Sequence, residues 1–245
     1  MASAEPSLNA RLDMRLRPRG IPAGYQEWRR LLFLHWPVAA EVVRPLVPAR
    51  LSLDLYDGMA YISLIPFWIQ AARPIGAPRA LGLSFLETNA RTYVHRDGRE
   101  PGVYFFSLDS TSLASVVGAR LSVGLPYMLA RGREQRNFSS VAYRLQRLMS
   151  SGRLSASYDI GAPAEAASPG SLDFFLVERY VLHVQRGGAL WSVRVHHQPY
   201  PLRVVHGLEF EESLLEADGV KRPAAAPLVH FATGVDVAIY PPRIR

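Results

Sequence analysis

The stretch LSFLETNARTYVH, residues 83–95, decides how this sequence can fold. Alternate residues of a β-strand point to the same face. One face of this strand therefore carries the polar and aromatic side chains of Phe85, Glu87, Asn89, Arg91 and Tyr93. If that face looks outward, it is an ordinary solvated face, with Glu87 and Arg91 paired. If it looks inward, the charges must pair or bind something, because an unpaired buried charge costs several kcal/mol.

Turn signals on either side of this strand predict a chain of hairpins. Asp97-Gly98 separates Leu83–His95 from the apolar run Val103–Leu108, and such a dipeptide is a strong hairpin signal. Three more pairs are predicted in the same way: Leu51–Tyr56 with Met59–Pro66 around Asp57-Gly58, Ser139–Leu148 with Leu154–Ile160, and Phe174–Gln185 with Ala189–Gln198 around Gly187-Gly188. Trp28–Trp36 is a further apolar strand.

Predicted helices are few. They cover Ala39–Leu46, Leu113–Val123 with Ser112 as the N-cap, and Phe210–Ala217. Because helices that could cross between parallel strands are mostly missing, we expect a mainly β, α+β fold built on an antiparallel sheet that is closed or nearly closed. Residues 1–22 are expected to be a flexible N-terminal arm, and residues 23–245 a single domain.

The composition limits the kinds of site. At 49% hydrophobic residues the chain can bury a sizeable core, and the lack of cysteine excludes disulfides, thiolate zinc sites and cysteine nucleophiles. We see neither a secretory signal nor an apolar run of membrane-spanning length, so a cytoplasmic protein without a membrane partner is expected.

The net charge of +7 comes almost entirely from arginine, because Lys221 is the only lysine. A nucleic-acid site would need basic residues gathered on one face beside stacking aromatics. Here the arginines are spread through every segment. A solvated basic surface with no nucleic-acid partner is therefore expected.

Several other strands end an apolar stripe with a titratable or hydroxyl group. His35 and Arg29 share a predicted face in the first strand, Ser107 and Asp109 do so after Phe105, and His197 follows another stripe. For a single histidine, a satisfied core position is the more common outcome. Several such strand ends converging in a barrel would make a mostly apolar pocket with a few polar groups.

Standard catalytic motifs are absent from the sequence. Nucleophile-elbow, dinucleotide-binding, P-loop and zinc-protease patterns do not occur. His196 and His197 would point to opposite faces of a strand, and nothing in the spacing of His35, His197 and Glu87 supports a zinc site. Neither a metal nor a cofactor is expected.

Segments across most of the chain resemble the uncharacterised family usually called YqjF-like. They are LFLHWPV (32–38), RPLVP (44–48), Asp57-Gly58 with Pro66-Phe67, Phe85–Val94, GVYFFSLD (102–109), LPY (125–127) and HQPYPL (197–202). The family looks like a branch of the acetoacetate-decarboxylase-like superfamily. The resemblance implies a double-cone β-barrel with a central pocket for a small molecule, and self-association into a homo-oligomer.

One segment departs from the superfamily pattern. Acetoacetate decarboxylases carry Gly-x-Pro-Lys-Lys-x-Ala, whereas the similar stretch here is GLPYMLA, residues 124–130. Tyr127 and Met128 stand in place of the lysines. A Schiff base needs an amine, so decarboxylation through an imine is not expected. Lys221 lies in a polar stretch and is a poor substitute.

The resemblance implies a site built around Glu87, Arg120 and Tyr127. Glu87 is expected to be the acid or base, Arg120 an anion clamp, and Tyr127 a donor to a developing oxyanion. Further substrate-binding residues are expected at Arg91, Asn89, Tyr93, His35, Arg29, Phe106, Met128 and His197.

Three functions remain open from the sequence. The first is a lyase, hydratase or isomerase acting on a carbonyl or carboxylate compound without an imine. The second is a non-catalytic module that binds a small apolar acid or a related metabolite. The third is a structural or interaction protein in which Glu87 and Arg91 only pair with each other.

Overall fold

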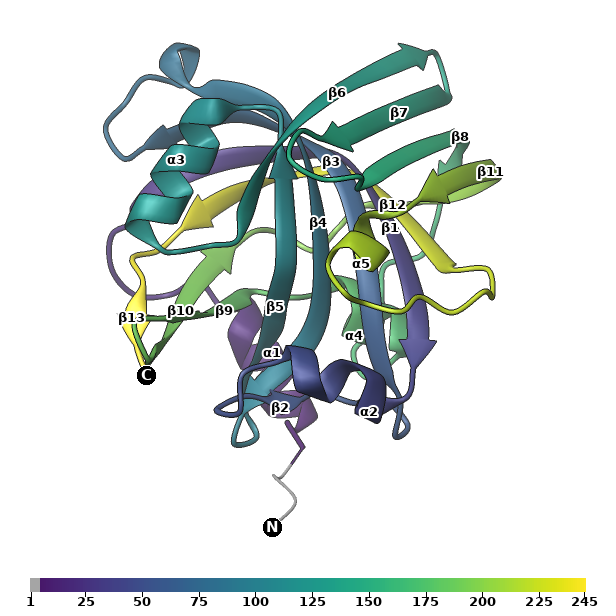
Figure 1. Cartoon of the computed structure of the whole chain (residues 1–245). Helices are drawn as coiled ribbons and strands as arrows, with labels where there is room; N and C mark the ends of the chain where they lie inside the picture. The colour runs from purple at the N-terminus through teal and green to yellow at the C-terminus, as the bar shows by residue number, and fades with distance from the viewer. Residues whose placement is uncertain (1–4) are drawn as a thin grey trace.

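In the computed structural model, which describes residues 5–245, thirteen strands form one continuous sheet (Figure 1). The strands are β1 (Gly24–Val38), β2 (Ser52–Leu53), β3 (Ala60–Pro74), β4 (Leu83–Arg96), β5 (Arg99–Ser110), β6 (Tyr127–Asn137), β7 (Ser140–Arg147), β8 (Arg153–Pro163), β9 (Val181–Arg186), β10 (Ala189–His196), β11 (Leu202–Glu212), β12 (Leu228–Ile239) and β13 (Arg243–Ile244). All pairings are antiparallel except those of β5 with β6 and with β9.

The sheet closes on itself twice. A first ring runs β4-β5-β9-β10-β12-β1-β3 and returns to β4. A second ring runs β5-β6-β7-β8-β11-β12-β1-β3-β4 and returns to β5. The sheet forks at β5, where Val103 and Tyr104 pair with β9 while residues 108–110 pair with β6. The two rings share five strands and form the expected double cone.

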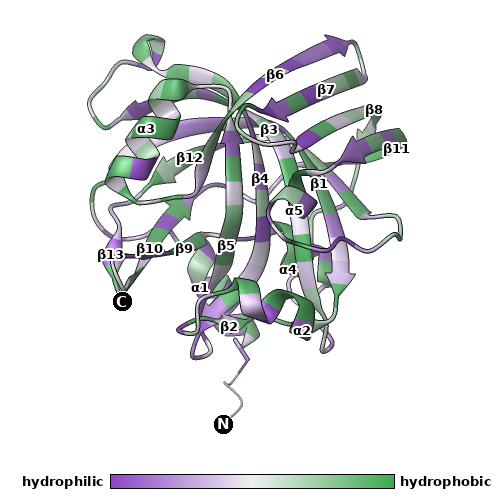
Figure 2. Cartoon of the chain, viewed as in Figure 1, coloured by the Kyte–Doolittle hydropathy of each residue, from purple (hydrophilic) through white to green (hydrophobic). Residues whose placement is uncertain are grey.

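Four of the shared strands, β1, β3, β4 and β5, are buried over most of their length, whereas β12 keeps exposed residues, and the sequence of β1 shows why. Leu31 and Phe33 of β1 enter the core of the first ring, whereas Leu32 and Leu34 enter the core of the second. Strands buried on both faces read as continuous apolar runs. By contrast, β7 belongs to the second ring alone and alternates buried with exposed residues. Figure 2 shows hydrophilic and hydrophobic segments alternating along β7.

Strand β4 divides its side chains between the two interiors. Leu86, Ala90 and Val94 pack into the core of the second ring. Glu87 and Arg91 face the first ring, and both are buried. The polar face of residues 83–95 therefore looks inward.

Short helices cover the ends of the rings. They are α1 (Leu8–Arg15), α2 (Ala40–Val43), α3 (Leu113–Ser122), α4 (Leu172–Val177) and α5 (Leu214–Ala217), with 3₁₀ turns at Arg44–Leu46 and Arg79–Leu81. Ser112 caps α3 by accepting a hydrogen bond from the Ser115 amide, as predicted. The last four residues of α4 are buried, and the Leu176 carbonyl accepts a hydrogen bond from Arg91, which lines the cavity described below.

The expected flexible arm, residues 1–22, contains a helix. Residues 1–4 lie outside the described part, but α1 packs beside β5, and Arg11 binds the buried Asp54 through two contacts of 2.6 Å. Arg194 also donates to the Met14 carbonyl at 2.8 Å. No residue of α1 is buried. The helix docks through guanidinium groups rather than an apolar stripe, so hydrophobic periodicity could not predict it.

The predicted hairpins have mixed outcomes. The β4–β5, β7–β8 and β9–β10 pairs are confirmed. The pair around Asp57-Gly58 is wrong: it is reduced to one bridge between Tyr56 and Met59, and β2 pairs with β4. Residues 172–177, partly predicted as strand, are the helix α4. Residues 210–212, predicted as helix, end β11.

Two β-bulges change which residues face the first ring. In β1 the register to β3 shifts beyond Arg29, where Arg30 has a φ of 53°. In β5, Phe105 lies opposite Arg91 and Ser107 lies opposite Ala90, so Phe106 is the extra residue. Because a bulge places two residues against one, the alternation of faces reverses across it.

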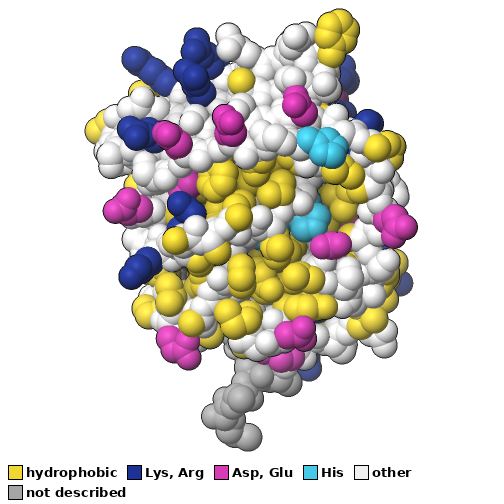
Figure 3. Space-filling view, turned by 90° about the vertical axis from the view of Figure 1, so that its right-hand side faces the viewer, with side chains coloured by type: hydrophobic (Ala, Val, Ile, Leu, Met, Phe, Trp, Pro, Cys, Tyr) yellow, Lys and Arg dark blue, Asp and Glu magenta, His cyan; other side chains and the backbone are white. Residues whose placement is uncertain are grey.

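No helix among residues 5–245 is long and apolar enough to cross a membrane. Figure 3 shows the side of the molecule on which β8 and β11 lie in Figure 1. Hydrophobic side chains form a broad band across the middle of this face, and most charged side chains lie at its edge.

Candidate active site

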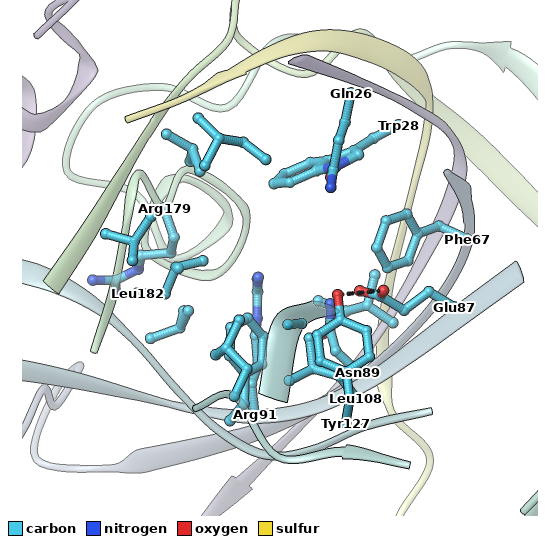
Figure 4. A pocket seen from close by; sticks show the side chains of 18 of the residues that line it. Gln26, Trp28, Phe67, Glu87, Asn89, Arg91, Leu108, Tyr127, Arg179 and Leu182 are labelled. Atoms are coloured by element: carbon cyan, nitrogen blue, oxygen red, sulfur yellow. Dashed lines mark hydrogen bonds between the residues drawn. The ribbon is translucent and has the colours of Figure 1, made fainter. Parts of the chain in front are cut away.

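The first ring encloses a cavity of about 250 Å³. Its wall is largely apolar, and its polar side chains come from β1, β4, the end of α3, the start of β6 and the residues before β9 (Figure 4). The exposed lining residue Ser122 and the partly buried Val123 and Gln26 mark the mouth beside α3. A mostly apolar cavity with a few convergent polar groups is the usual form of a small-molecule site.

Glu87 and Tyr127 form a hydrogen-bonded pair in the wall. The Tyr127 phenol donates to the Glu87 carboxyl group at 2.8 Å, and both side chains are buried. Burial raises the pKa of Glu87 to about 8, Asp109 adds to the rise, and the Tyr127 hydrogen bond opposes it. Burial also raises the pKa of Tyr127, well above that of a free phenol. At neutral pH, Glu87 is therefore mostly a protonated acid.

Arg91 presents a buried guanidinium to the same cavity, with 8% of the residue exposed. Its Nη2 donates to the Leu176 carbonyl at the end of α4 at 3.1 Å, and its Nε has no partner. No carboxylate among residues 5–245 forms an ion pair with it, so the proposed pairing of Glu87 with Arg91 is not what the structure shows. Figure 4 shows the Arg91 guanidinium directed into the cavity, apart from Glu87 and Tyr127.

Asn89 lies between these two groups on β4 and lines the cavity. The structure gives its Oδ1 no hydrogen-bond partner, although the atom is buried. A buried amide oxygen without a partner is costly, so this position favours a ligand or a water that donates a hydrogen bond.

Arg179 is a cavity residue that the sequence analysis missed. Its Nη1 donates to Asp54 at 2.5 Å and its Nε to the Phe175 carbonyl at 2.7 Å. Asp54 binds Arg11 as well, so one carboxylate serves two guanidinium groups. The sequence predicts a strand over Phe174–Gln185 and singles out no face of it, and the partner Asp54 lies 125 positions away along the chain.

Tyr93 and His35 lie behind the cavity wall and do not line it. The Tyr93 hydroxyl donates to the Leu176 carbonyl at 2.9 Å and contacts Ser63 at 2.8 Å. Ser63 contacts His35 Nδ1 at 2.7 Å. Burial holds the pKa of His35 well below its usual value, so the ring is neutral. These side chains form a buried network that supports the wall next to Arg91.

His197 is also buried behind the wall. Its ring lies 4.5 Å from that of Tyr180 and 4.6 Å from that of Tyr200, between centroids. Burial lowers its pKa to about 4. Because Tyr200 and Trp28 line the cavity, His197 packs against lining residues without reaching the space itself.

Arg120 and Met128 lie outside the cavity. Arg120 is exposed on α3, and its Nε donates to the backbone carbonyl of Tyr127 at 2.7 Å. Its Nη2 lies 3.5 Å from the Met128 sulfur. Arg120 is thus not a clamp on the cavity contents; it holds the backbone that carries Tyr127. Consecutive strand residues point to opposite faces, which turns Met128 away once Tyr127 faces inward.

Arg29 and Phe106 do not line the cavity. Arg29 pairs with Glu27 at 3.0 Å and with Asp236 at 2.5 Å, while Trp28 takes the place facing the cavity. Phe106 packs against the core of the second ring. Strict alternation had placed Arg29 on the face of Leu31, and the bulge at Arg30 breaks that alternation.

The same effect moves Ser107 and Asp109 into the second ring. Arg147 binds Asp109 at 2.6 and 2.8 Å, Asp218 at 2.8 Å and Ser107 at 2.9 Å. The charged groups of this buried cluster pair with one another. Leu108 takes the cavity side instead.

Lys221 is exposed and does not line the cavity. The wall therefore offers no lysine amine for an imine. Among residues 5–245, no group of three or more His, Cys, Asp or Glu side chains could hold a metal ion.

Comparison with known proteins places this geometry in a family. The model of the DUF2071 family, described as an uncharacterized conserved protein, matches residues 25–236. This chain belongs to the DUF2071 family. The chain is also similar to the uncharacterized protein YqjF of Bacillus subtilis (strain 168), with 37% identity over 229 residues, 92% of this chain and 94% of YqjF. The YqjF-like resemblance is confirmed.

Solved structures similar to this DUF2071 chain have the acetoacetate-decarboxylase-like fold. Acetoacetate decarboxylase from Legionella pneumophila gives a TM-score of 0.66 at 14% identity, over 100% of this chain and 97% of that one. The enduracididine biosynthesis enzyme MppR complexed with pyruvate gives 0.64 at 12% identity, over 92% and 91%. At these identities the likeness concerns the fold, and it confirms the expected fold class.

Proposed function

We propose that the cavity binds a small organic acid bearing a carbonyl group, and that Glu87 exchanges a proton with it in a lyase, hydratase or isomerase reaction without an imine. The observation that carries this proposal is the buried, unpaired Arg91 guanidinium in the same apolar cavity as the protonated Glu87. The ligand carboxylate would pair with the Arg91 guanidinium, and the ligand carbonyl would lie beside the Glu87 carboxyl group.

Arg91 supports the choice of an acid. A guanidinium is permanently charged, and its forked donors match a carboxylate. Leaving a charge buried without a counter-charge costs several kcal/mol, which a bound carboxylate would offset. Arg179 forms an ion pair with Asp54, whereas Arg91 has no carboxylate partner among residues 5–245, so a ligand carboxylate is expected at Arg91.

Glu87 supports proton transfer. A catalytic group works best with a pKa near the working pH, and burial brings the pKa of Glu87 to about 8. The ionised carboxylate would take a proton from the carbon beside the carbonyl. The electron pair of that C–H bond would form the C=C bond of an enolate, and the negative charge would pass to oxygen. The protonated Glu87 would then return the proton.

The comparisons are compatible with this class of ligand. MppR, which shares the fold, is described in complex with pyruvate, a carboxylate with a carbonyl group. Its identity to this chain is only 12%, so the argument rests on Arg91 and Glu87 themselves.

A binding module that holds such an acid unchanged is the second candidate. The observation favouring it is that Glu87 is the one carboxyl group among the described residues that line the cavity. A reaction that needs separate acid and base groups would have to use Tyr127 as the second, and that phenol has a strongly raised pKa.

Titration calorimetry with pyruvate, 4-oxopentanoate and 6-oxoheptanoate tests binding. Arg91→Met should weaken binding of these acids at least tenfold, whereas Arg144→Met, an exposed arginine of β7, should leave it unchanged. If no acid binds, or if Arg91→Met binds as well as the parent protein, the proposal is wrong.

Deuterium exchange at carbons beside the ketone, followed by NMR in D₂O, tests catalysis. Exchange should be accelerated by the protein, and Glu87→Gln should reduce it by about 100-fold. Binding without exchange would assign the protein to the second candidate.

A further inference from the structure

We infer that the ligand is an elongated acid, with its carboxylate at Arg91 and its carbonyl at the Glu87–Tyr127 pair, joined by an apolar spacer of about four carbons. This inference rests on the proposed function and adds the substrate class. Three features of the cavity carry it: the separation of the two polar ends, the direction of the Arg91 side chain, and the apolar wall between them.

The separation follows from the strand. Glu87 and Arg91 lie on the same face of β4, four residues apart, which corresponds to roughly 13 Å. Side chains of a strand stand roughly perpendicular to the sheet, so they do not close this gap by themselves. Two hydrogen bonds of about 2.8 Å would leave roughly 7–8 Å for the ligand between its two oxygen ends.

The Arg91 side chain leans away from Glu87. Its guanidinium carbon lies 5.5 Å from the centre of the Tyr93 ring, and Tyr93 is the next residue on this face beyond Arg91. The Leu176 carbonyl holds it there at 3.1 Å. Consistently, burial and Asp109 raise the pKa of Glu87 without an opposing contribution from Arg91.

The wall between the two ends is apolar apart from Asn89. Phe67 lies opposite Glu87 on β3, Ile65 lies opposite Asn89, and Leu108 lies opposite Asn89 on β5. All of them line the cavity. A methylene chain or a flat ring would bury its surface against these side chains, whereas a short polar ligand would leave them against water.

Pyruvate fits this arrangement poorly because its carboxylate and ketone carbons are adjacent. It can reach Arg91 or Glu87, but not both. In 6-oxoheptanoate four methylene groups separate the same two functions. Heptanoate keeps the length and the carboxylate but lacks the ketone, and is the matched control.

Titration calorimetry on the full chain at pH 7 tests the inference. We expect 6-oxoheptanoate to bind at least tenfold more tightly than pyruvate, and more tightly than heptanoate. Glu87→Leu should lower the affinity for 6-oxoheptanoate to that for heptanoate, whereas Arg144→Met, at an exposed position of β7, should leave the affinities for all three acids unchanged. The ligand series on the parent protein decides the question even if this variant fails to fold.

Two outcomes separate the inference from the proposed function. If pyruvate binds as tightly as 6-oxoheptanoate, with both dependent on Arg91, the elongated ligand is wrong and the proposed function stands. If neither acid binds, the proposed function fails with it.

Discussion

The phenol of Tyr127 donates a hydrogen bond of 2.8 Å to the carboxyl group of Glu87, and so joins β6 to β4 across the cavity wall. The bond favours the ionised form of Glu87, because a donor stabilises a carboxylate more than a neutral acid. Burial works in the opposite direction and is stronger. The ionisation of the site is set by this competition.

Replacing Tyr127 by Phe should therefore raise the pKa of Glu87 further above 8. A hydrogen bond to a charged group contributes about 1.5–3 kcal/mol, which corresponds to roughly one pKa unit or more. Carbon-13 NMR of the carboxyl group during a pH titration would measure the shift. Tyr104→Phe, a partly buried tyrosine of β5, is the control and should leave the titration unchanged. A lower pKa in Tyr127→Phe would contradict the account.

Glu87 should make the protein less stable as the pH rises. Between pH 4.5 and about 8 the folded state keeps a proton on Glu87 that the unfolded chain has released. The free energy of unfolding then falls with pH, at up to about 1.4 kcal/mol per pH unit from this group. Urea unfolding of the parent protein and of Glu87→Gln should show the difference. Glu87→Gln has no titratable carboxyl group at this position. The free energy of unfolding of the variant should therefore rise relative to that of the parent protein from pH 5 to pH 8, and the difference should stay constant above about pH 9.

The buried histidines should destabilise the fold at acid pH. His35, His95, His183 and His197 all have pKa values lowered mainly by burial, that of His197 to about 4. Below pH 6.5 the unfolded chain takes up protons that the folded state does not, so the free energy of unfolding falls as the pH drops toward 4. His197→Phe should reduce this loss by up to about 1.4 kcal/mol per pH unit. His206→Asn, at an exposed position of β11, should not alter the slope.

Arg147 should be a stability residue rather than a site residue. Its loss would leave Asp109 and Asp218 without their counter-charge, and breaking a buried ion pair in this way costs about 3–5 kcal/mol. Arg147→Met should therefore lower the free energy of unfolding by about this amount. Arg144→Met on the same strand should change it by less than about 0.5 kcal/mol. Equal changes in the free energy of unfolding of the two variants would show that the cluster does not stabilise the fold.

Local pattern predicted the β4–β5 hairpin and the polar face of β4, because both depend on alternation and turn dipeptides within one segment. It did not predict that the sheet closes into two rings, since closure depends on pairings such as that of β12 with β10, far apart in the chain. The resemblance to a known family supplied that part of the fold.

The candidate site shows the same division. Glu87, Asn89, Arg91 and Tyr127 line one cavity, and their roles in a site stay a prediction. Arg29, Ser107 and Asp109 were misplaced because a bulge breaks the alternation of each strand, and nothing local in the sequence marks the extra residue. Arg179 was missed because its partner Asp54 lies 125 positions away along the chain.

The division of β4 between two interiors has a practical consequence for protein engineering. Positions 87, 89 and 91 shape the cavity, whereas positions 86, 90 and 94 pack the other ring. A library that randomises the first set alone would sample new ligand preferences while the second set keeps the scaffold constant. Ligand recognition and core stability can therefore be changed separately on the same strand.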